Sequence, residues 1–361
     1  MVLNKLLFSF GVSAVAVSVA IFYLMKSRKS KRVVKSGWQK IGHVSALFIH
    51  PVKSMRGQSV RTVDVTNMGL KLGNNIDRRF LVVKEKYDKT YGTMVTIRNY
   101  PKMTLITPTV DTNNILTLDY RDADHSDTFQ LDLNSIQQAF EARGEVIMWR
   151  DQIVKGIDCG DEVACWLSRI LKPTNNVFCR LLWQTESIVN SEPRTIDLDD
   201  STGCVVSDPR NNVLTNYSDL TPFMIAHNQS LNELNTRIQA ILDEFPNNEL
   251  TMRSFRPNIV VDTQLPPYDE DTWKRVKIRG VIFTYVKPCT RCILTTVDPE
   301  TGVKNPNREP LRTLRKYRLS EAPDSPECEK TSPKFGINVV VDHLSAGACI
   351  SVGDDVFVEY F

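Results

Sequence analysis

The amino-acid sequence predicts an α+β fold with a barrel-like β core, preceded by one membrane-spanning helix. Short apolar runs of strand length, bounded by turn residues, recur from about residue 41 to the C-terminus. Helical patterns are fewer and do not alternate regularly with the strand patterns, which favours α+β over a parallel α/β sheet. The third observation is one long uncharged stretch near the N-terminus.

Residues 6–25 (LLFSFGVSAVAVSVAIFYLM) contain no charged side chain. As a helix they would be about 30 Å long, which is enough to cross the hydrocarbon core of a bilayer. Six Lys and Arg residues follow within positions 26–35, and only Lys5 precedes the stretch. Because basic flanks stay on the cytosolic side, we expect residues 1–35 to be a signal-anchor with the rest of the chain in the cytosol.

Two other targeting functions are less compatible with this segment. A cleaved secretory signal could end at the small residues 18–20, but the charge lies on the wrong flank and the apolar run is too long. A matrix-targeting peptide would be amphipathic and rich in arginine, and this segment is neither.

The charge of the remaining chain argues against nucleic-acid binding. Subtracting the seven basic side chains of residues 1–35 from the 45 of the whole chain leaves 38, against 42 acidic side chains. A mildly acidic body without a basic stripe does not suit a polyanionic partner. The basic run is explained by membrane topology and by anionic lipid headgroups.

Strand and helix patterns can be placed along the rest of the chain. Strands are predicted at 44–49, 60–65, 79–83, 94–97, 115–118, 259–261, 281–286 and 356–358. A first helix is predicted at 161–171, where acidic residues open an amphipathic pattern. A second should begin at the capping box Ser230–Glu233, and a third should span 310–318 with the proline in its first turn.

The segment from about 186 to 212 is rich in Ser, Asp, Pro and Asn and is the best candidate for a linker or mobile loop. We therefore divide the soluble part into an N-terminal region, 36–185, and a C-terminal domain, 186–361.

The CxxC pair Cys289–Cys292 has several possible functions. A structural zinc site needs four ligands, but there is no second CxxC and the five histidines show no paired spacing. A thioredoxin-type pair should open a helix, whereas 293–297 favours a strand. A disulfide is disfavoured in a chain that faces the cytosol. Two unreactive thiols, or one thiolate that binds a metal, remain open, and Arg291 between them could stabilise a thiolate or bind an anion.

The residues around this pair resemble a known family. Residues 288–302 (PCTRCILTTVDPETG) are similar to the signature of MOSC-domain proteins, which bind a pterin-based molybdenum cofactor. Further segments resemble the MOSC N-terminal region and the MOSC core in the same order: 41–54, 73–82, 92–98, 217–223 and 255–261. With its apolar N-terminal segment, the chain is similar to the amidoxime-reducing branch of the family, found in mitochondria. The resemblance implies a β-barrel-like MOSC core behind a β-rich MOSC N-terminal region.

The resemblance also implies roles for individual residues. Cys292 would be the thiolate ligand of molybdenum, beside the two dithiolene sulfurs of the cofactor. Asp219 stands where relatives place an acid near the metal, and it could orient a substrate N–OH, relay protons, or only cap a turn. The pterin and its phosphate would be bound by Lys53, Ser54, Arg78, Arg256, Asn258, Thr290 and Arg291, with Arg98, Ser218 and Thr221 as further candidates.

The function that this resemblance implies is reduction of N-hydroxylated compounds such as amidoximes, N-hydroxyguanidines and hydroxylamines. Electrons would come from NADH through NADH-cytochrome b5 reductase and cytochrome b5. The enzyme would be anchored in the outer mitochondrial membrane, with its C-terminal body facing the cytosol. A cofactor sulfurase is a poorer alternative, because residues 37–288 cannot hold both its pyridoxal-phosphate domain and the MOSC N-terminal region. A non-catalytic cofactor carrier remains open.

Two departures from the family pattern affect substrate preference most. Arg79 and Phe80 replace an aromatic pair expected after Arg78, and the segment 184–216 differs in length and composition.

Overall fold

Residues 37–361 are described by a computed structural model, apart from the segments 86–90, 139–142, 148–152, 174–176, 192–193, 198–211, 242–248, 324 and 345–346. The predicted signal-anchor, 1–35, lies outside the described residues. Within the part of the chain that the structure describes, no helix is both long and apolar enough to cross a membrane.

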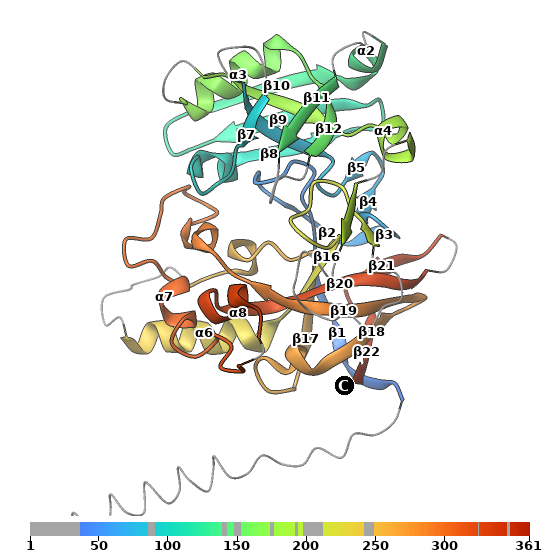
Figure 1. Ribbon diagram of the computed structural model, residues 1–361, viewed down its shortest axis with the longest axis vertical. Helices are drawn as coiled ribbons and strands as arrows, with labels where there is room; N and C mark the ends of the chain where they lie inside the picture. Colours follow the sequence, from blue (N-terminus) through green and yellow to red (C-terminus); the bar gives the residue numbers. More distant parts are fainter. Residues whose placement is uncertain are drawn as a thin grey trace, which may run out of the picture. The chain divides into compact units, whose positions relative to one another are not determined.

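A closed ring of seven strands forms the C-terminal core, as the predicted barrel-like fold requires (Figure 1). Only β16 and β17 pair in parallel; the other neighbours are antiparallel. The ring closes where the first strand pairs with β17, and the short β2 (Gln58–Val60) extends it. In spatial order the strands are β17 (Ile259–Thr263), β16 (Phe223–His227), β20 (Lys334–Leu344), β19 (Val281–Thr290), β18 (Trp273–Ile278), β22 (Asp355–Tyr360) and β1 (Gln39–Ile49).

Alternating apolar residues of these strands fill the ring. Trp273, Phe223 and Phe283 are among its fully buried side chains, and the rings of Phe223 and Phe283 meet edge to face with centroids 5.3 Å apart. The core therefore follows from the strand periodicity on which the prediction rested.

A second closed barrel and two further sheets are formed mostly by the N-terminal region. That barrel contains β11 (Arg143–Ile147), β12 (Ile153–Asp158), β13 (Cys179–Trp183), β6 (Phe80–Glu85) and β7 (Tyr91–Met94). One adjacent sheet consists of β8 (Ile106–Val110), β9 (Ile115–Arg121) and β10 (Ser126–Asp132). A four-stranded sheet joins β21 (Cys349–Ser351), β3 (Thr62–Thr66), β4 (Gly69–Leu72) and β5 (Asn75–Ile76).

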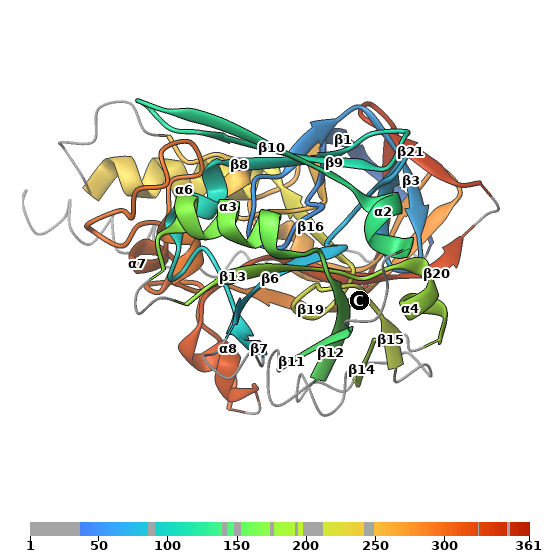
Figure 2. The same ribbon diagram turned by 90° about the horizontal axis from the view of Figure 1, so that it is seen from above.

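The helices are few and mostly short. Helix α3 (Asp161–Leu171) confirms the first helix prediction and lies between β13 and the β8–β10 sheet (Figure 2). Its Trp166 packs on Phe129 of β10. The other α-helices in the described residues are α2 (Leu133–Gln138), α4 (Glu186–Ser191), α6 (Asn228–Ile241), α7 (Leu311–Leu314) and α8 (Glu327–Thr331). Short 3-10 helices are η1 (Pro101–Leu105), η3 (Met252–Ser254), η4 (Asp269–Thr272) and η5 (Ile293–Thr296).

The strand predicted at 293–297 is wrong, because the chain forms η5 there. The hydroxyl of Thr295 donates to the carbonyl of Cys292 (2.9 Å), and that of Thr296 donates to the carbonyl of Ile293 (2.8 Å). These side-chain bonds satisfy backbone acceptors locally, which favours a tight turn over a strand.

The prediction that a helix begins at a capping box, Ser230–Glu233, is also wrong. Helix α6 begins at Asn228, two residues before Ser230. The Ser230 hydroxyl instead donates to the buried carboxylate of Glu270 (2.8 Å) and accepts the backbone N–H of Tyr268 (2.8 Å). The Ser230 hydroxyl is therefore bonded to residues distant in sequence and, contrary to the local pattern, does not cap the helix.

Other predicted bounds change as well. The run 60–65 splits at Arg61 into β2 and β3, and β7 ends at Met94, where the strand 94–97 was predicted to begin. The third helix is only α7, four residues long. The predicted linker contains α4 and β14 (Thr195–Asp197), and β15 (Asn212–Leu214), which pairs antiparallel with β14, begins at the last residue of that linker.

Barrel closure depends on a close approach of backbones at Gly42. This residue pairs with Thr263 of β17 and with Val356 of β22. A Cβ at position 42 would lie 1.9 Å from the carbonyl oxygen of Asp262, a distance that no side chain can occupy. Glycine is therefore required where β1 meets both neighbours.

A buried pair joins the end of β1 to the loop after β5. The backbone N–H of His50 donates to Asp77 Oδ1 (2.7 Å), and that of Arg78 donates to the carbonyl of His50 (2.7 Å). Burial, reinforced by Arg256, lowers the pKa of His50 to about 3. Burial acts to raise the pKa of Asp77, but Arg78 and His50 outweigh it and lower that pKa to about 2. His50 is therefore neutral in the folded protein at pH 7.

The first prediction concerns Gly42. We expect Gly42→Ala to lower the free energy of unfolding by about 3 kcal/mol, because two paired backbones must separate. Gly73→Ala is the matched control: its φ of 57° strains any side chain, but nothing lies within 4 Å of an added Cβ. The control should cost about 1–2 kcal/mol. Urea unfolding measures both, and a cost at position 42 no greater than that at 73 would contradict the close approach.

The second prediction concerns acid. The folded pKa of His50 lies below its ordinary value of 6.5, so its contribution to stability is complete above about pH 6.5 and is lost as the pH falls towards 3. Between pH 7 and pH 4.5 the loss in the free energy of unfolding amounts to about 2–3 kcal/mol, at 1.36 kcal/mol per pK unit. His50→Gln should remove that part of the pH dependence. Parallel stability curves for the two proteins between pH 7 and pH 4.5 would show that His50 is not responsible.

Candidate functional site

One large cavity of about 870 Å³ lies where the N-terminal region meets the seven-stranded barrel. Every site residue predicted from the sequence lines it: Lys53, Ser54, Arg78, Arg98, Ser218, Asp219, Thr221, Arg256, Asn258, Thr290, Arg291 and Cys292. These residues come from loops and strand ends that are up to 239 positions apart, from Lys53 to Cys292. The volume falls within the range of typical small-ligand cavities.

Three of the lining residues adopt backbone conformations that non-glycine residues rarely adopt. The φ angles are 70° at Ser54, 52° at Arg78 and 56° at Arg256. Such strain costs about 1–2 kcal/mol per residue and is concentrated at functional sites. Here it turns three separate loops so that their side chains reach one cavity.

The guanidinium of Arg256 is buried, and one of its nitrogens takes no part in the protein's own hydrogen bonds in the described ranges. Burial lowers its pKa to about 9, and the neighbouring Arg78 contributes in the same direction. Its Nη2 has no hydrogen-bond acceptor among the described residues. A buried cationic donor in this state is costly unless a ligand accepts from it.

Arg291 is held by contacts on two sides. Its Nη2 donates to the carbonyl of Phe255 (2.6 Å), and its Nη1 donates to the sulfurs of Cys289 (2.7 Å) and Met224 (3.4 Å). Its buried Nε has no acceptor among the described residues. Ser218 lines the same cavity, and its buried hydroxyl likewise has no hydrogen-bond partner among the described residues.

Lys53 joins the cavity to the loop that carries Asp219. Its ammonium donates to the carbonyl of Tyr217 (2.7 Å) and forms an ion pair with Asp219. Burial lowers the pKa of Lys53 to about 8, and Asp219 opposes that shift. The side chain of Asp219 is 62% exposed, so the pair connects a buried ammonium to solvent.

Arg194 is a site residue that the sequence did not reveal. It is buried, and its Nη1 donates to the carbonyls of Asn216 (2.7 Å) and Ser218 (2.6 Å). These bonds hold the loop that presents Ser218 and Asp219. The residue lies in the segment predicted as a linker, where no local pattern distinguishes it from a solvated arginine.

Some of the lining residues serve the protein's own hydrogen bonds. Asn258 accepts the N–H of Met224 (3.2 Å) and donates to the carbonyl of Phe48 (3.4 Å). The hydroxyl of Thr221 donates to the carbonyl of Phe223 (2.9 Å), in keeping with a turn function. Their polar atoms are therefore less available to a ligand than those of Arg256, Arg291 and Ser218.

The two cysteines of the CxxC pair lie in different surroundings. The thiol of Cys289 accepts from Arg291, whereas Cys292 precedes η5 and lines the cavity. All seven cysteines in the described ranges are free, and those ranges contain no cluster of three His, Cys, Asp or Glu side chains that could hold a metal. The pair is thus neither a disulfide nor half of a recognisable zinc site in the described part of the chain.

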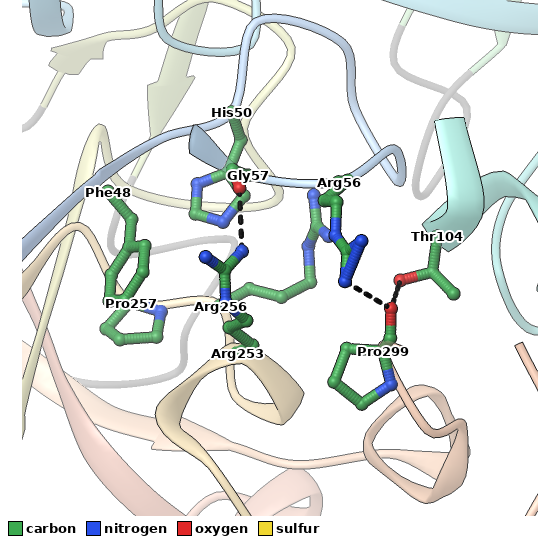
Figure 3. Close-up of a pocket in the computed structure, with 9 residues that line it drawn as sticks. All are labelled: Phe48, His50, Arg56, Gly57, Thr104, Arg253, Arg256, Pro257 and Pro299. Carbon is green, nitrogen blue, oxygen red and sulfur yellow. Dashed lines mark hydrogen bonds between the residues drawn. The ribbon is translucent and has the colours of Figure 1, made fainter. Parts of the chain in front are cut away.

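A second, much smaller cavity adjoins Arg256 (Figure 3). Its volume, about 10 Å³, suits a single water molecule. Arg253 closes it by donating to the carbonyl of Gly57 (3.0 Å), and Arg56 does so by donating to that of Pro299 (3.4 Å). Arg256 lines both cavities and forms part of the wall between them.

Known proteins match this chain over nearly its whole length. Residues 41–174 match the MOSC N-terminal beta barrel domain, and residues 215–357 match the MOSC domain. "Mitochondrial amidoxime reducing component 2" of Macaca fascicularis and that of Homo sapiens are each 35% identical over 347 residues, covering 96% of this chain and 91% of theirs. "Mitochondrial amidoxime-reducing component 1" of Mus musculus is 33% identical over 350 residues, covering 96% of this chain and 90% of its own.

Two domain matches in the expected order, and identity of this extent, confirm the resemblance that the sequence motifs indicated. The chain belongs to the family of mitochondrial amidoxime-reducing components, which are MOSC-domain proteins.

Proposed function

We propose that this protein is a molybdenum-cofactor-dependent reductase of N-hydroxylated compounds, among them amidoximes, N-hydroxyguanidines and hydroxylamines. The observation that carries the proposal is that buried cationic donors, without acceptors in the described ranges, converge on one cavity beside Cys292. The relatives' names support amidoximes as one substrate class. Family membership supports, more generally, a mitochondrial oxidoreductase with a molybdenum cofactor.

The residues present suit an anionic pterin cofactor. Six Lys and Arg side chains line the cavity against a single carboxylate, that of Asp219. A phosphate accepts well from planar guanidiniums, such as those of Arg256 and Arg291, and from an ammonium such as that of Lys53. Cys292, with its soft sulfur, would be the protein ligand of the metal. Once bound, the cofactor supplies the two-electron redox chemistry.

The protein's own residues would manage protons and position. Reduction of an amidoxime consumes two electrons and two protons, breaks the N–O bond and releases an amidine and water. The Lys53–Asp219 pair is suited to supply protons, because one member is buried against the cavity and the other is largely in solvent. The pKa of Lys53, about 8, leaves Nζ able to both hold and release a proton near neutral pH. Arg194 would keep Asp219 in place through the Ser218 carbonyl.

The electron donors and the location are also proposals. We propose that NADH supplies electrons through NADH-cytochrome b5 reductase and cytochrome b5. We further propose that residues 1–35 anchor the chain in the outer mitochondrial membrane with the C-terminal body in the cytosol, because residues 6–25 are uncharged and a basic run follows them. A non-catalytic cofactor carrier would share the cavity but would not turn over N-hydroxylated compounds.

The third prediction tests the two cysteines against each other. Cys292→Ser should abolish reduction of benzamidoxime to benzamidine by the chemically reduced protein, because the proposed metal ligand is lost. Cys289→Ser should keep substantial activity, since a serine hydroxyl can still accept from Arg291. Benzamidine formation and molybdenum content are measured for both variants. Equal loss in the two would favour a two-thiolate site or a redox pair instead.

A further inference from the structure

Lys287 provides the large cavity with a second cationic region. It lies in β19 opposite Asn338 of β20, and its Nζ is 3.6 Å from the sulfur of Cys328 and 3.7 Å from a carboxylate oxygen of Glu329, both in α8. Lys53 and Arg256, in contrast, have Arg78 and Asp219 as shared charged neighbours. Within the described ranges, neither the hydrogen bond nor the ion pair of the Lys287 ammonium involves a site residue predicted from the sequence.

This ammonium is buried and has unused donors. Lys287 is only 5% exposed. Within the described part of the chain, no oxygen accepts a hydrogen bond from its Nζ; its partners are the weakly accepting thiol of Cys328 and the more distant carboxylate of Glu329. An ammonium carries three donors, so at least one can bind an acceptor in the cavity. A buried donor without an acceptor is unfavourable, and a ligand anion would relieve that cost.

The compensating carboxylate lies behind the lysine. Lys287 and Cys328 line the cavity, whereas Glu329 does not, and Glu329 is 6% exposed. Glu329 therefore offsets the charge of Lys287 from the protein side. An anion that enters the cavity can reach the ammonium without facing the carboxylate, and the neighbouring Ser332 and Asn338 present neutral polar groups.

We propose that Lys287 is a specificity-determining residue that binds an anionic group of the substrate, so that the chain prefers N-hydroxylated compounds that also carry a carboxylate. The N-hydroxylated part of this inference rests on the proposed function; the anion-binding part does not. A charge-assisted hydrogen bond of this kind corresponds to about a tenfold to hundredfold preference.

Cys328 allows the anion site to be tested without enzyme turnover. Iodoacetate and iodoacetamide alkylate thiols by the same displacement of iodide but differ in one carboxylate. At Cys328, the ratio of the iodoacetate rate to the iodoacetamide rate should be about tenfold higher in the wild-type protein than in Lys287→Met, because Lys287 attracts the carboxylate of iodoacetate. Cys165 is the internal control, because it is exposed on α3 and its ratio should be the same in both proteins. Peptide mass spectrometry gives each rate.

Lys287→Gln serves as a second neutral variant in case methionine disturbs folding. If the ratio at Cys328 does not fall in either correctly folded variant, Lys287 does not bind anions from the cavity and the proposal is overturned. If both variants lose molybdenum, Lys287 holds the cofactor instead, which also overturns it.

The substrate part is tested with 4-carboxybenzamidoxime and benzamidoxime. Wild-type protein should favour the carboxylated compound in kcat/KM by about tenfold or more, chiefly through KM, and Lys287→Met should remove the preference. If the wild type and Lys287→Met prefer the carboxylated compound equally, the assignment of Lys287 is refuted. If the alkylation ratio responds to Lys287 but neither compound is reduced, the proposed function fails and the anion site remains.

Discussion

Buried positive charge around the large cavity is the constraint on which the rest of the structure depends. Arg256 and Arg291 each hold a buried nitrogen without an acceptor in the described structure, and Lys53 and Lys287 are buried beside the same cavity. Removing a cation from water costs several kcal/mol unless partners replace the lost hydration. A fold that retains such groups has a ligand to compensate them, or it loses stability without benefit. In the proposed function, an anionic cofactor and an anionic substrate would supply that compensation in two regions of one cavity.

Bringing these charges together requires the barrel and the strained turns at once. The barrel closes at Gly42, which lets β1 pair with two neighbours and places its C-terminal end beside the loop that carries Asp77 and Arg78. The left-handed conformations at Ser54, Arg78 and Arg256 then turn each loop inward. Local strain and buried charge both lower stability, and the well-packed apolar interior of the barrel offsets them.

Sequence reasoning succeeded where pattern and chemistry are local. Most of the strand runs, α3 and the motif around Cys292 depend on neighbouring residues, and the twelve predicted side chains do line one cavity. It failed where a distant partner decides: Ser230 binds Glu270 forty positions away instead of capping α6, and Arg194 holds a loop through two carbonyls. Lys287 had no sequence signal either, because its significance lies in the weakly accepting thiol of Cys328 and the distant carboxylate of Glu329, which only the fold brings to it.

The most direct measurement is the ratio of molybdenum to protein in the purified wild-type chain and in two arginine variants. The wild type should contain about one molybdenum per chain. Arg256→Ala should hold at least about tenfold less when the cofactor is limiting, since a charge-assisted bond to a buried anion is lost. Arg253→Ala is the matched control, because Arg253 lines the small cavity and not the large one, so its loss should leave the molybdenum content unchanged. Zinc in place of molybdenum in the wild type, or full occupancy in Arg256→Ala, would contradict the account.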